Sequence, residues 1–451
     1  MIRPLYRTAC LDAPIALLLL FTSVLAFAQH QLTFTPYRAS GIYSIDEVVG
    51  WNIRPAENAT LLHYFYTVKR NNTDIVRSGH IDLSAGFATI EVQLNEPAMI
   101  LVEVVAEREA GSLSLRANPE GKLAPSGSDS AIADRKPIPE ATLGAAIAPT
   151  LLKPSVDRPA DFDSFWQSKL SLLASIPMNP QLTSVPSDRA GVDLYTVKLD
   201  SVDSHVQGYL AKPSKPGKYP ALLMYEYAGV HKLRPADSVD RAEAGWLAFN
   251  VDSHDIPPTE STGAPMDYYE VGNRDREKCY FLDMYLRDAR AIDYIVDSPD
   301  WDGKTIVLVG TSMGGQQGLA VAALNRRRVT AVIVNEPSGA DTNGSLHGRK
   351  AGNPYWPSSD PQVMKTSLYF DPVNFAPLIE ASTIVAVGFI DTTCPPVGVW
   401  TLINQITAPK EIVPMIESGH SYQTPEKQLN FTHRSEEALN ILLHGGDLRL
   451  H

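Results

Sequence analysis

The chain has 451 residues, of which 44% are hydrophobic, so it is long enough to bury the cores of two or three domains. Its 39 basic and 51 acidic residues give a net charge of −12, which repels a phosphate backbone. Nucleic acid is therefore excluded as a partner class.

The N-terminus has the composition of a secretory signal. Arg3 and Arg7 precede an apolar run over residues 15–27, and Ala26-Phe27-Ala28 has the A-x-A form of a cleavage site. The apolar run is too short to span a bilayer, and no later segment is long and apolar enough for a membrane anchor. We expect residues 1–28 to be removed, the protein to be exported to the periplasm or outside the cell, and no integral membrane segment to remain.

Two further segments precede the region with catalytic motifs. Residues 29–107 alternate apolar and polar side chains in short runs separated by turn clusters, which predicts a small all-β, immunoglobulin-like sandwich. Residues 108–149 are rich in Ala, Gly, Pro, Ser and charged residues, which predicts a linker. Cys10 leaves with the signal, and we expect Cys279 and Cys394 to remain as unpaired buried thiols rather than as a disulfide.

Residues 150–451 alternate predicted strands and helices, beginning with an amphipathic helix that starts near Asp161 and ends at about Leu173. The expected strands are 194–199, 207–211, 221–226, 247–251, 306–309, 329–334, 383–388 and 411–416. The later expected helices are 279–297, 313–325, 396–406 and 435–443. This alternation predicts an α/β, doubly wound, mostly parallel sheet covered on both faces.

Ser312 lies in Gly310-Thr311-Ser312-Met313-Gly314, directly after a buried strand and before an alanine-rich helix. A G-x-S-x-G pattern arises by chance in about one chain of this length in ten, so its context decides. A sharp strand-to-helix turn needs small neighbours and leaves the serine Oγ exposed, as in the nucleophile elbow of α/β-hydrolases. The alternative is an ordinary glycine-rich turn.

A serine nucleophile needs a histidine base and an acid that orients it, in the chain order Ser, Asp or Glu, His. His420 directly follows a predicted strand, and Asp391 follows another, so both are expected at strand ends. Asp371, in a turn-like setting, is expected to cap, and Glu417 is too close to His420 to support its ring. The other histidines after Ser312 are less well placed: His347, His433, His444 and His451.

Other parts of the site are expected from loops. The backbone N–H groups of Met313 and Ala228, with Tyr227 next, are the candidates for the oxyanion hole. Residues 337–364 form a long irregular stretch in which Tyr355 and Trp356 are candidate sugar-stacking side chains. The alternative for these two is a packed surface loop with buried aromatic residues.

Several segments then resemble one family, that of acetyl xylan esterases and cephalosporin C deacetylases. They are residues 161–166 (DFDSFW), 310–315 (GTSMGG), 369–377 (YFDPVNFAP), 388–396 (GFIDTTCPP) and 419–420 (GH). The resemblance covers roughly residues 150–425 and implies the α/β-hydrolase fold with Ser312, Asp391 and His420 as the catalytic triad. The chain departs from the family at Met313, where glutamine is usual, and in its Glu226-Tyr227-Ala228 loop, where His-Gly-Tyr is usual. An Arg-Gly-Gln element is also missing near residues 252–255, and the β-rich N-terminal region is additional.

The residues and the resemblance together predict an exported serine carboxylesterase that removes acetyl groups from oligo- or polysaccharides through an acyl-serine intermediate. No metal and no organic cofactor is required for this chemistry. The resemblance also points to a homo-oligomer, although an added domain would change that packing. The alternatives are a prolyl-oligopeptidase-like peptidase, which usually carries a far longer β-propeller, and a non-catalytic carbohydrate-binding protein on a hydrolase scaffold.

Overall fold

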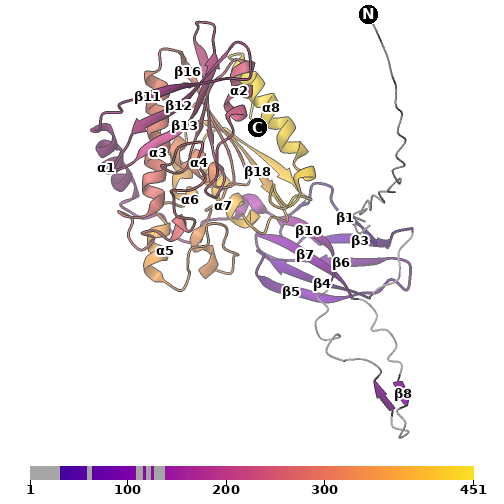
Figure 1. The fold of residues 1–451 in the computed structure, drawn as a ribbon. Helices are drawn as coiled ribbons and strands as arrows, with labels where there is room; N and C mark the ends of the chain where they lie inside the picture. Colours follow the sequence, from indigo (N-terminus) through magenta and orange to yellow (C-terminus); the bar gives the residue numbers. More distant parts are fainter. Residues whose placement is uncertain (1–30, 58–62, 108–114, 118–122, 126–137, 451) are drawn as a thin grey trace, which may run out of the picture.

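The computed structural model describes residues 31–57, 63–107, 115–117, 123–125 and 138–450 (Figure 1). The expected signal peptide, residues 1–28, and most of the expected linker lie outside these residues. In the described part of the chain, no helix is both long and apolar enough to cross a membrane.

The N-terminal part contains two β-sheets around one core. The first sheet has the order β1 (Leu32–Pro36), β3 (Val49–Pro55) and β6 (Ala88–Val92). The second has the order β2 (Ile42–Tyr43), β10 (Ile138–Ile147), β7 (Ala98–Glu107), β4 (His63–Arg70) and β5 (Asp74–Ile81). Trp51 and Ile90 of the first sheet share a buried cluster with Tyr66 and Val102 of the second. The immunoglobulin-like type of this region stays a prediction.

Strand β10 lies within the segment expected to be a linker. It pairs antiparallel with β7 and parallel with β2, and Ala145 and Ile147 are buried in the core that the two sheets share. The prediction that the linker extends to residue 149 is therefore wrong for residues 138–147, which belong to the N-terminal sheet. Gly144, one of the small residues that suggested a loop, is needed for packing, because a Cβ there would lie 2.7 Å from Cβ of Phe389. Two further short strands, β8 (Leu115–Ala117) and β9 (Leu123–Pro125), form a separate antiparallel pair.

The rest of the chain is built on a nine-stranded sheet. Its spatial order is β11 (Gln181–Val185), β12 (Val192–Asp200), β13 (His205–Pro213), β15 (Leu247–Val251), β14 (Tyr219–Tyr225), β16 (Trp301–Thr311), β17 (Ala331–Asn335), β18 (Ser382–Gly388) and β19 (Lys410–Met415). The strands from β15 to β19 in this order are mutually parallel, and the three at the other edge are antiparallel. The mostly parallel sheet predicted from the sequence is confirmed. Strand β11 was not expected, because it is a largely exposed edge strand without apolar alternation.

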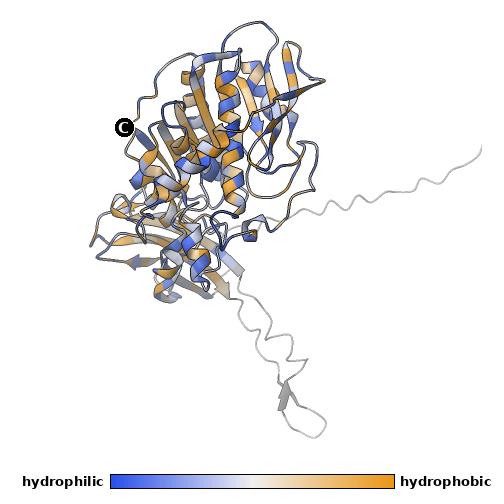
Figure 2. Cartoon of the chain, turned by 90° about the vertical axis from the view of Figure 1, so that its left-hand side faces the viewer, coloured by the Kyte–Doolittle hydropathy of each residue, from blue (hydrophilic) through white to orange (hydrophobic). Residues whose placement is uncertain are grey.

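Helices cover both faces of this sheet. The helices on one face are α1 (Phe162–Ala174), α3 (Tyr280–Asp297), α4 (Met313–Leu324), α5 (Pro361–Ser367), α6 (Pro372–Phe375) and α7 (Pro396–Gln405). The helices on the other face are α2 (Pro235–Ala244) and α8 (Leu429–Leu443). Successive side chains of a strand point to opposite faces of the sheet. Leu308 therefore packs against the helices of the first face and Val307 against those of the second. Figure 2 shows the resulting hydrophobic interior along the strands.

Short 3-10 helices complete the described chain: η2 (Pro149–Leu151), η3 (Tyr268–Glu270), η4 (Thr342–Leu346), η5 (Ala376–Leu378) and η6 (Pro425–Lys427). The N-terminal sheets lie against one end of the larger sheet (Figure 1). A Cβ at Gly41 would lie 3.1 Å from Ile416, just past the end of β19. The loops that follow β18 and β19 are therefore close to the N-terminal part.

Candidate active site

Ser312 occupies a strained turn between the central strand β16 and helix α4. Its φ of 56° and ψ of −118° are rare for any residue with a side chain, and its backbone N–H donates to the Asn335 carbonyl at 2.9 Å. A Cβ at Gly310 would lie 2.3 Å from the Gly314 carbonyl carbon, and one at Gly314 would lie 2.1 Å from the Tyr225 carbonyl oxygen. The two glycines are therefore required by close backbone contacts, and the expected strand, turn and helix are present.

His420 and Asp391 form a buried hydrogen-bonded pair. His420 Nδ1 lies 2.7 Å from Asp391 Oδ2, and their side chains are 4% and 1% exposed. The other carboxylate oxygen, Oδ1, accepts hydrogen bonds from the N–H groups of Thr393 at 2.7 Å and Cys394 at 2.8 Å. Burial alone would lower the pKa of His420, but the hydrogen bond and charge of Asp391 raise it above its ordinary value, with a smaller contribution from Glu336. The loops after β18 and β19 thus supply an oriented imidazole.

One cavity brings these separate segments together. It has a volume of about 610 Å³. Its lining consists of Tyr227, Ala228, Thr311, Ser312, Asn353, Thr393, His420, Ser421 and Tyr422. The turn serine, the histidine and the two loop residues expected at an oxyanion hole therefore share one cavity. Met313 is the first residue of α4, where the backbone N–H has no partner within the helix.

The competing acids and histidines have other positions. Asp371 caps helix α6 by accepting a hydrogen bond from the Val373 N–H at 2.8 Å, as expected. Glu417 is exposed and pairs with Lys427 at 2.7 Å. His347, His433 and His444 are exposed, and His451 lies outside the described residues.

The two aromatic residues expected to bind sugar differ in position. Trp356 is 6% exposed and its ring lies 5.7 Å from that of Phe281 in the hydrophobic core. A ring packed in this way offers no open face to a sugar, so this prediction is wrong for Trp356. Tyr355 is 52% exposed, and its role stays a prediction. The long segment of residues 337–364 does reach the cavity, through Asn353.

Sequence reasoning missed two side chains beside His420. Tyr422 is 70% exposed, and its ring lies 5.3 Å from the imidazole at 68°. Glu336 is 1% exposed, and its Oε2 lies 3.6 Å from His420 Nδ1. The available signal for Glu336 was its place directly after a predicted strand and between Ser312 and His420 in the chain, as for Asp391.

The N-terminal part contacts the same loops. The turn between β4 and β5 places Asn72 Nδ2 3.2 Å from the Asp391 carbonyl oxygen. Thr73 Oγ1 donates to the Gly348 carbonyl at 2.8 Å, and the Lys350 N–H donates to the Asn71 carbonyl at 3.0 Å. The turn therefore holds both the Asp391 loop and part of the segment that reaches the cavity.

One group of metal-ligand residue types occurs in the described part of the chain, and it overlaps the histidine–aspartate pair. Atoms of Asp391, Cys394 and His420 lie within 4.8 Å of one another. Burial raises the pKa of the Cys394 thiol well above its ordinary value, and both oxygens of Asp391 already accept hydrogen bonds. A protonated thiol is a poor metal ligand, so the group suits hydrogen bonding better than metal binding. Cys279 and Cys394 are both unpaired and buried, as expected.

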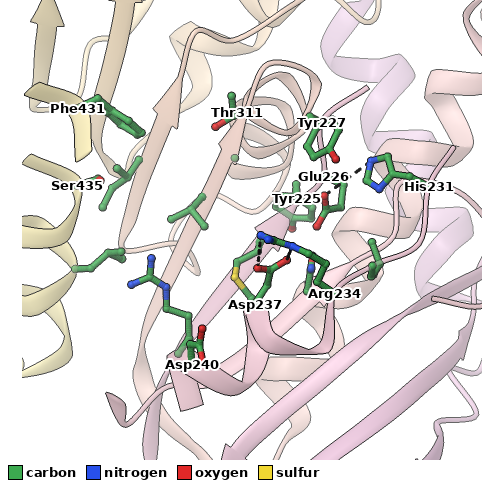
Figure 3. A pocket seen from close by; sticks show the side chains of 18 of the residues that line it. Tyr225, Glu226, Tyr227, His231, Arg234, Asp237, Asp240, Thr311, Phe431 and Ser435 are labelled. Carbon is green, nitrogen blue, oxygen red and sulfur yellow. Dashed lines mark hydrogen bonds and ion pairs between the residues drawn. The ribbon is translucent and has the colours of Figure 1, made fainter. Parts of the chain in front are cut away.

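A larger cavity of about 770 Å³ lies between α2 and α8 (Figure 3). Tyr227 and Thr311 line both cavities, but Ser312 and His420 do not line this one. Its charged side chains face one another: Arg234 pairs with Asp237 at 2.7 Å, and His231 lies 4.0 Å from Glu226. Because Ser312 and His420 do not line this cavity, it is not the candidate site for ester hydrolysis.

A serine turn after the central strand of a mostly parallel sheet, with an acid and a histidine at later strand ends, defines the class of α/β-hydrolases. Residues 151–435 match the acetyl xylan esterase (AXE1) family. The match covers more than half of the chain, so the chain belongs to this family and is a carboxylic ester hydrolase. The family predicted from the sequence is confirmed.

The similar proteins agree with this assignment. The acetyl esterase Axe7A of Xylanibacter ruminicola is 28% identical over 435 residues, which cover 91% of this chain and 95% of Axe7A. The acetyl xylan esterase of Paenibacillus sp. R4 is 25% identical with a TM-score of 0.54, over 63% of this chain and 98% of the solved one. Acetyl xylan esterase 1 of Thermoanaerobacterium sp. JW/SL YS485 has the same fold at 22% identity, with a TM-score of 0.55 over 63% of this chain and 97% of its own. The larger coverage by Axe7A indicates that most of the N-terminal β region has a counterpart there.

Proposed function

We propose that this chain removes acetyl groups from acetylated oligo- or polysaccharides through an acyl-Ser312 intermediate. The observation that carries the proposal is the cavity that the strained Ser312 and the Asp391-bound His420 both line. Membership of the acetyl xylan esterase family supports the acetyl ester as the substrate bond.

The geometry supports a two-step mechanism. The Asp391 hydrogen bond to Nδ1 holds one tautomer of His420 and leaves Nε2 to take the proton of Ser312 Oγ as Oγ attacks the acetyl carbonyl carbon. The backbone N–H groups of Met313 and Ala228, with Tyr227 as the second choice in that loop, stabilise the oxyanion. His420 then gives its proton to the departing sugar oxygen, forming the acyl-enzyme. A water molecule deprotonated by His420 hydrolyses this ester and restores the free serine.

The rim of the cavity is suited to carbohydrate. Tyr227 and Tyr422 line it and are 54% and 70% exposed, and Tyr355 is also exposed on the same long segment as Asn353. Exposed tyrosine rings bind sugars by stacking on their apolar faces while the hydroxyl remains free for hydrogen bonds. We assign Tyr422 and Tyr355 to sugar contact and exclude Trp356.

Export and assembly are further parts of the proposal. The signal-like composition of residues 1–28 supports export before the enzyme meets polysaccharide. A homo-oligomer stays a prediction from the family resemblance.

Acetate release from acetylated xylan tests the proposal directly. The protein lacking residues 1–28 should release acetate, and Ser312→Ala should reduce the rate to the residual catalysis of the oxyanion hole. A fluorophosphonate should label the wild-type protein at Ser312. Preference for peptide substrates would favour a peptidase, and absence of both labelling and acetate release would favour a non-catalytic scaffold.

A further inference from the structure

Two carboxylates converge on one nitrogen of His420. Asp391 Oδ2 lies 2.7 Å from His420 Nδ1, and Glu336 Oε2 lies 3.6 Å from the same atom. Asp391 follows β18 and Glu336 follows β17, the strand next to the one that leads to Ser312. The side chain of Glu336 is 1% exposed, so its carboxyl group depends on hydrogen bonds from the protein rather than from water.

Each oxygen of the Glu336 carboxylate accepts a hydrogen bond from the segment that follows His420. Its Oε2 accepts a hydrogen bond from the Ser421 N–H at 2.7 Å, and its Oε1 accepts one from Gln428 Nε2 at 3.0 Å. Gln428 precedes the first turn of α8. Glu336 therefore connects the end of β17 to the residue that follows His420 and to the start of the last helix.

The local backbone is arranged around this side chain. Glu336 has a φ of 45°, in the left-handed region that a side chain rarely adopts, and its N–H donates to the Ala386 carbonyl at 3.1 Å. A Cβ at Gly388 would lie 2.8 Å from Glu336 Oε1, so the glycine leaves the space that the carboxylate occupies. A residue in a strained conformation and a glycine without a Cβ thus lie on either side of one buried carboxylate.

We propose that Glu336 is a second acid of this site, a positioning residue that holds the His420 loop and shares with Asp391 the stabilisation of the imidazolium. The inference rests on the proposed function, because it assumes that His420 is the base. Burial, followed by the charge of Asp391, raises the pKa of Glu336 to about 7. The titratable groups that face Glu336 are Asp391, His420 and Cys394. The buried Cys394 thiol retains its proton.

The pH profile separates this role from a merely structural one. Glu336 raises the pKa of His420, so replacing it with neutral glutamine should move the acid limb of kcat/KM to lower pH. Glu336→Asp keeps the charge, and aspartate tolerates the left-handed backbone, so this variant should keep the limb near its wild-type position. A Glu336→Gln profile that is lower at every pH, with the limb unmoved, would overturn the proposal.

A double-mutant cycle provides the second test. Loss of the only acid of a serine triad lowers kcat by about 10⁴. With Glu336 beside the same nitrogen, Asp391→Asn should lower kcat by only about 10²–10³. Glu336→Gln should lower kcat by a factor at least ten times larger in the Asp391→Asn background than in the wild type. If Glu336→Gln does not fold, Asp391→Asn alone decides, and a loss of about 10⁴ or more contradicts the second acid. Ser312→Ala is measured in parallel, because activity retained there would refute the proposed function itself rather than the role of Glu336.

Discussion

The sharpest structural prediction concerns Gly314, in the first turn of α4. In Gly314→Ala, the new Cβ would lie 2.1 Å from the backbone carbonyl oxygen of Tyr225, whereas real Cβ contacts essentially never fall below 3.0 Å. Helix α4 must therefore move away from β14 by about 0.9 Å, the difference between these distances. A displacement of about 1 Å at a reacting group lowers the rate about 10²-fold, and overpacking of this kind destabilises by about 1–3 kcal/mol.

The matched control is one helical turn further along α4. A Cβ at Gly318 would meet Val334 Cγ1 at 3.7 Å, an ordinary contact, so Gly318→Ala should fold at least as well as the wild type. The kcat for p-nitrophenyl acetate and the thermal unfolding midpoint would be measured for both variants. A kcat for Gly314→Ala within threefold of that for Gly318→Ala would refute the reasoning about the elbow.

The other predictions concern the supports of the site and its rim. Asn72→Gly tolerates the left-handed backbone but loses the hydrogen bond to the Asp391 carbonyl, so kcat should fall about fivefold, equivalent to about 1 kcal/mol, with little change in KM for p-nitrophenyl acetate. Trp356→Ala should lower the free energy of unfolding in urea by about 3–5 kcal/mol and change KM equally for acetylated xylo-oligosaccharides and p-nitrophenyl acetate. Tyr355→Ala should raise KM for the oligosaccharides selectively, and equal effects on the two substrates would remove it from the sugar contacts. Because the neutral ring is the base and the pKa of His420 is raised, kcat/KM should rise with pH and reach half its maximum above pH 6.5; a midpoint below that value would contradict the influence of Asp391.

The main sheet and the turn at Ser312 were predictable because the residue pattern of each segment favours the same structure that the whole fold requires. Residues 306–309 of β16 and 331–334 of β17 are uninterrupted apolar runs, and the glycines around Ser312 have a direct steric reason. The predicted strands and the chain order also placed Asp391 and His420 at strand ends, where the structure has His420 lining the cavity and Asp391 bonded to it.

Other features depend on contacts between distant residues, which one sequence does not reveal. Strand β10 contains Gly144, which a loop would also favour, because this position must fit against Phe389, far along the chain. Trp356 and Tyr355 are adjacent in sequence, yet one packs on Phe281 and the other is exposed. Glu336 is one of many acidic residues, and only the folding of β17 beside β18 brings it to His420.

The central claim, an acyl-Ser312 intermediate in ester hydrolysis, is tested most directly by trapping that intermediate. The wild-type protein would be mixed with p-nitrophenyl acetate, quenched in acid within one turnover, digested and analysed by mass spectrometry. We predict one acetyl group on Ser312 in the quenched wild-type protein and none at that peptide in Ser312→Ala, which should also turn over at only a residual rate. Rapid acetate release by the Ser312→Ala variant, with no acetylated Ser312 in the wild type, would contradict the account.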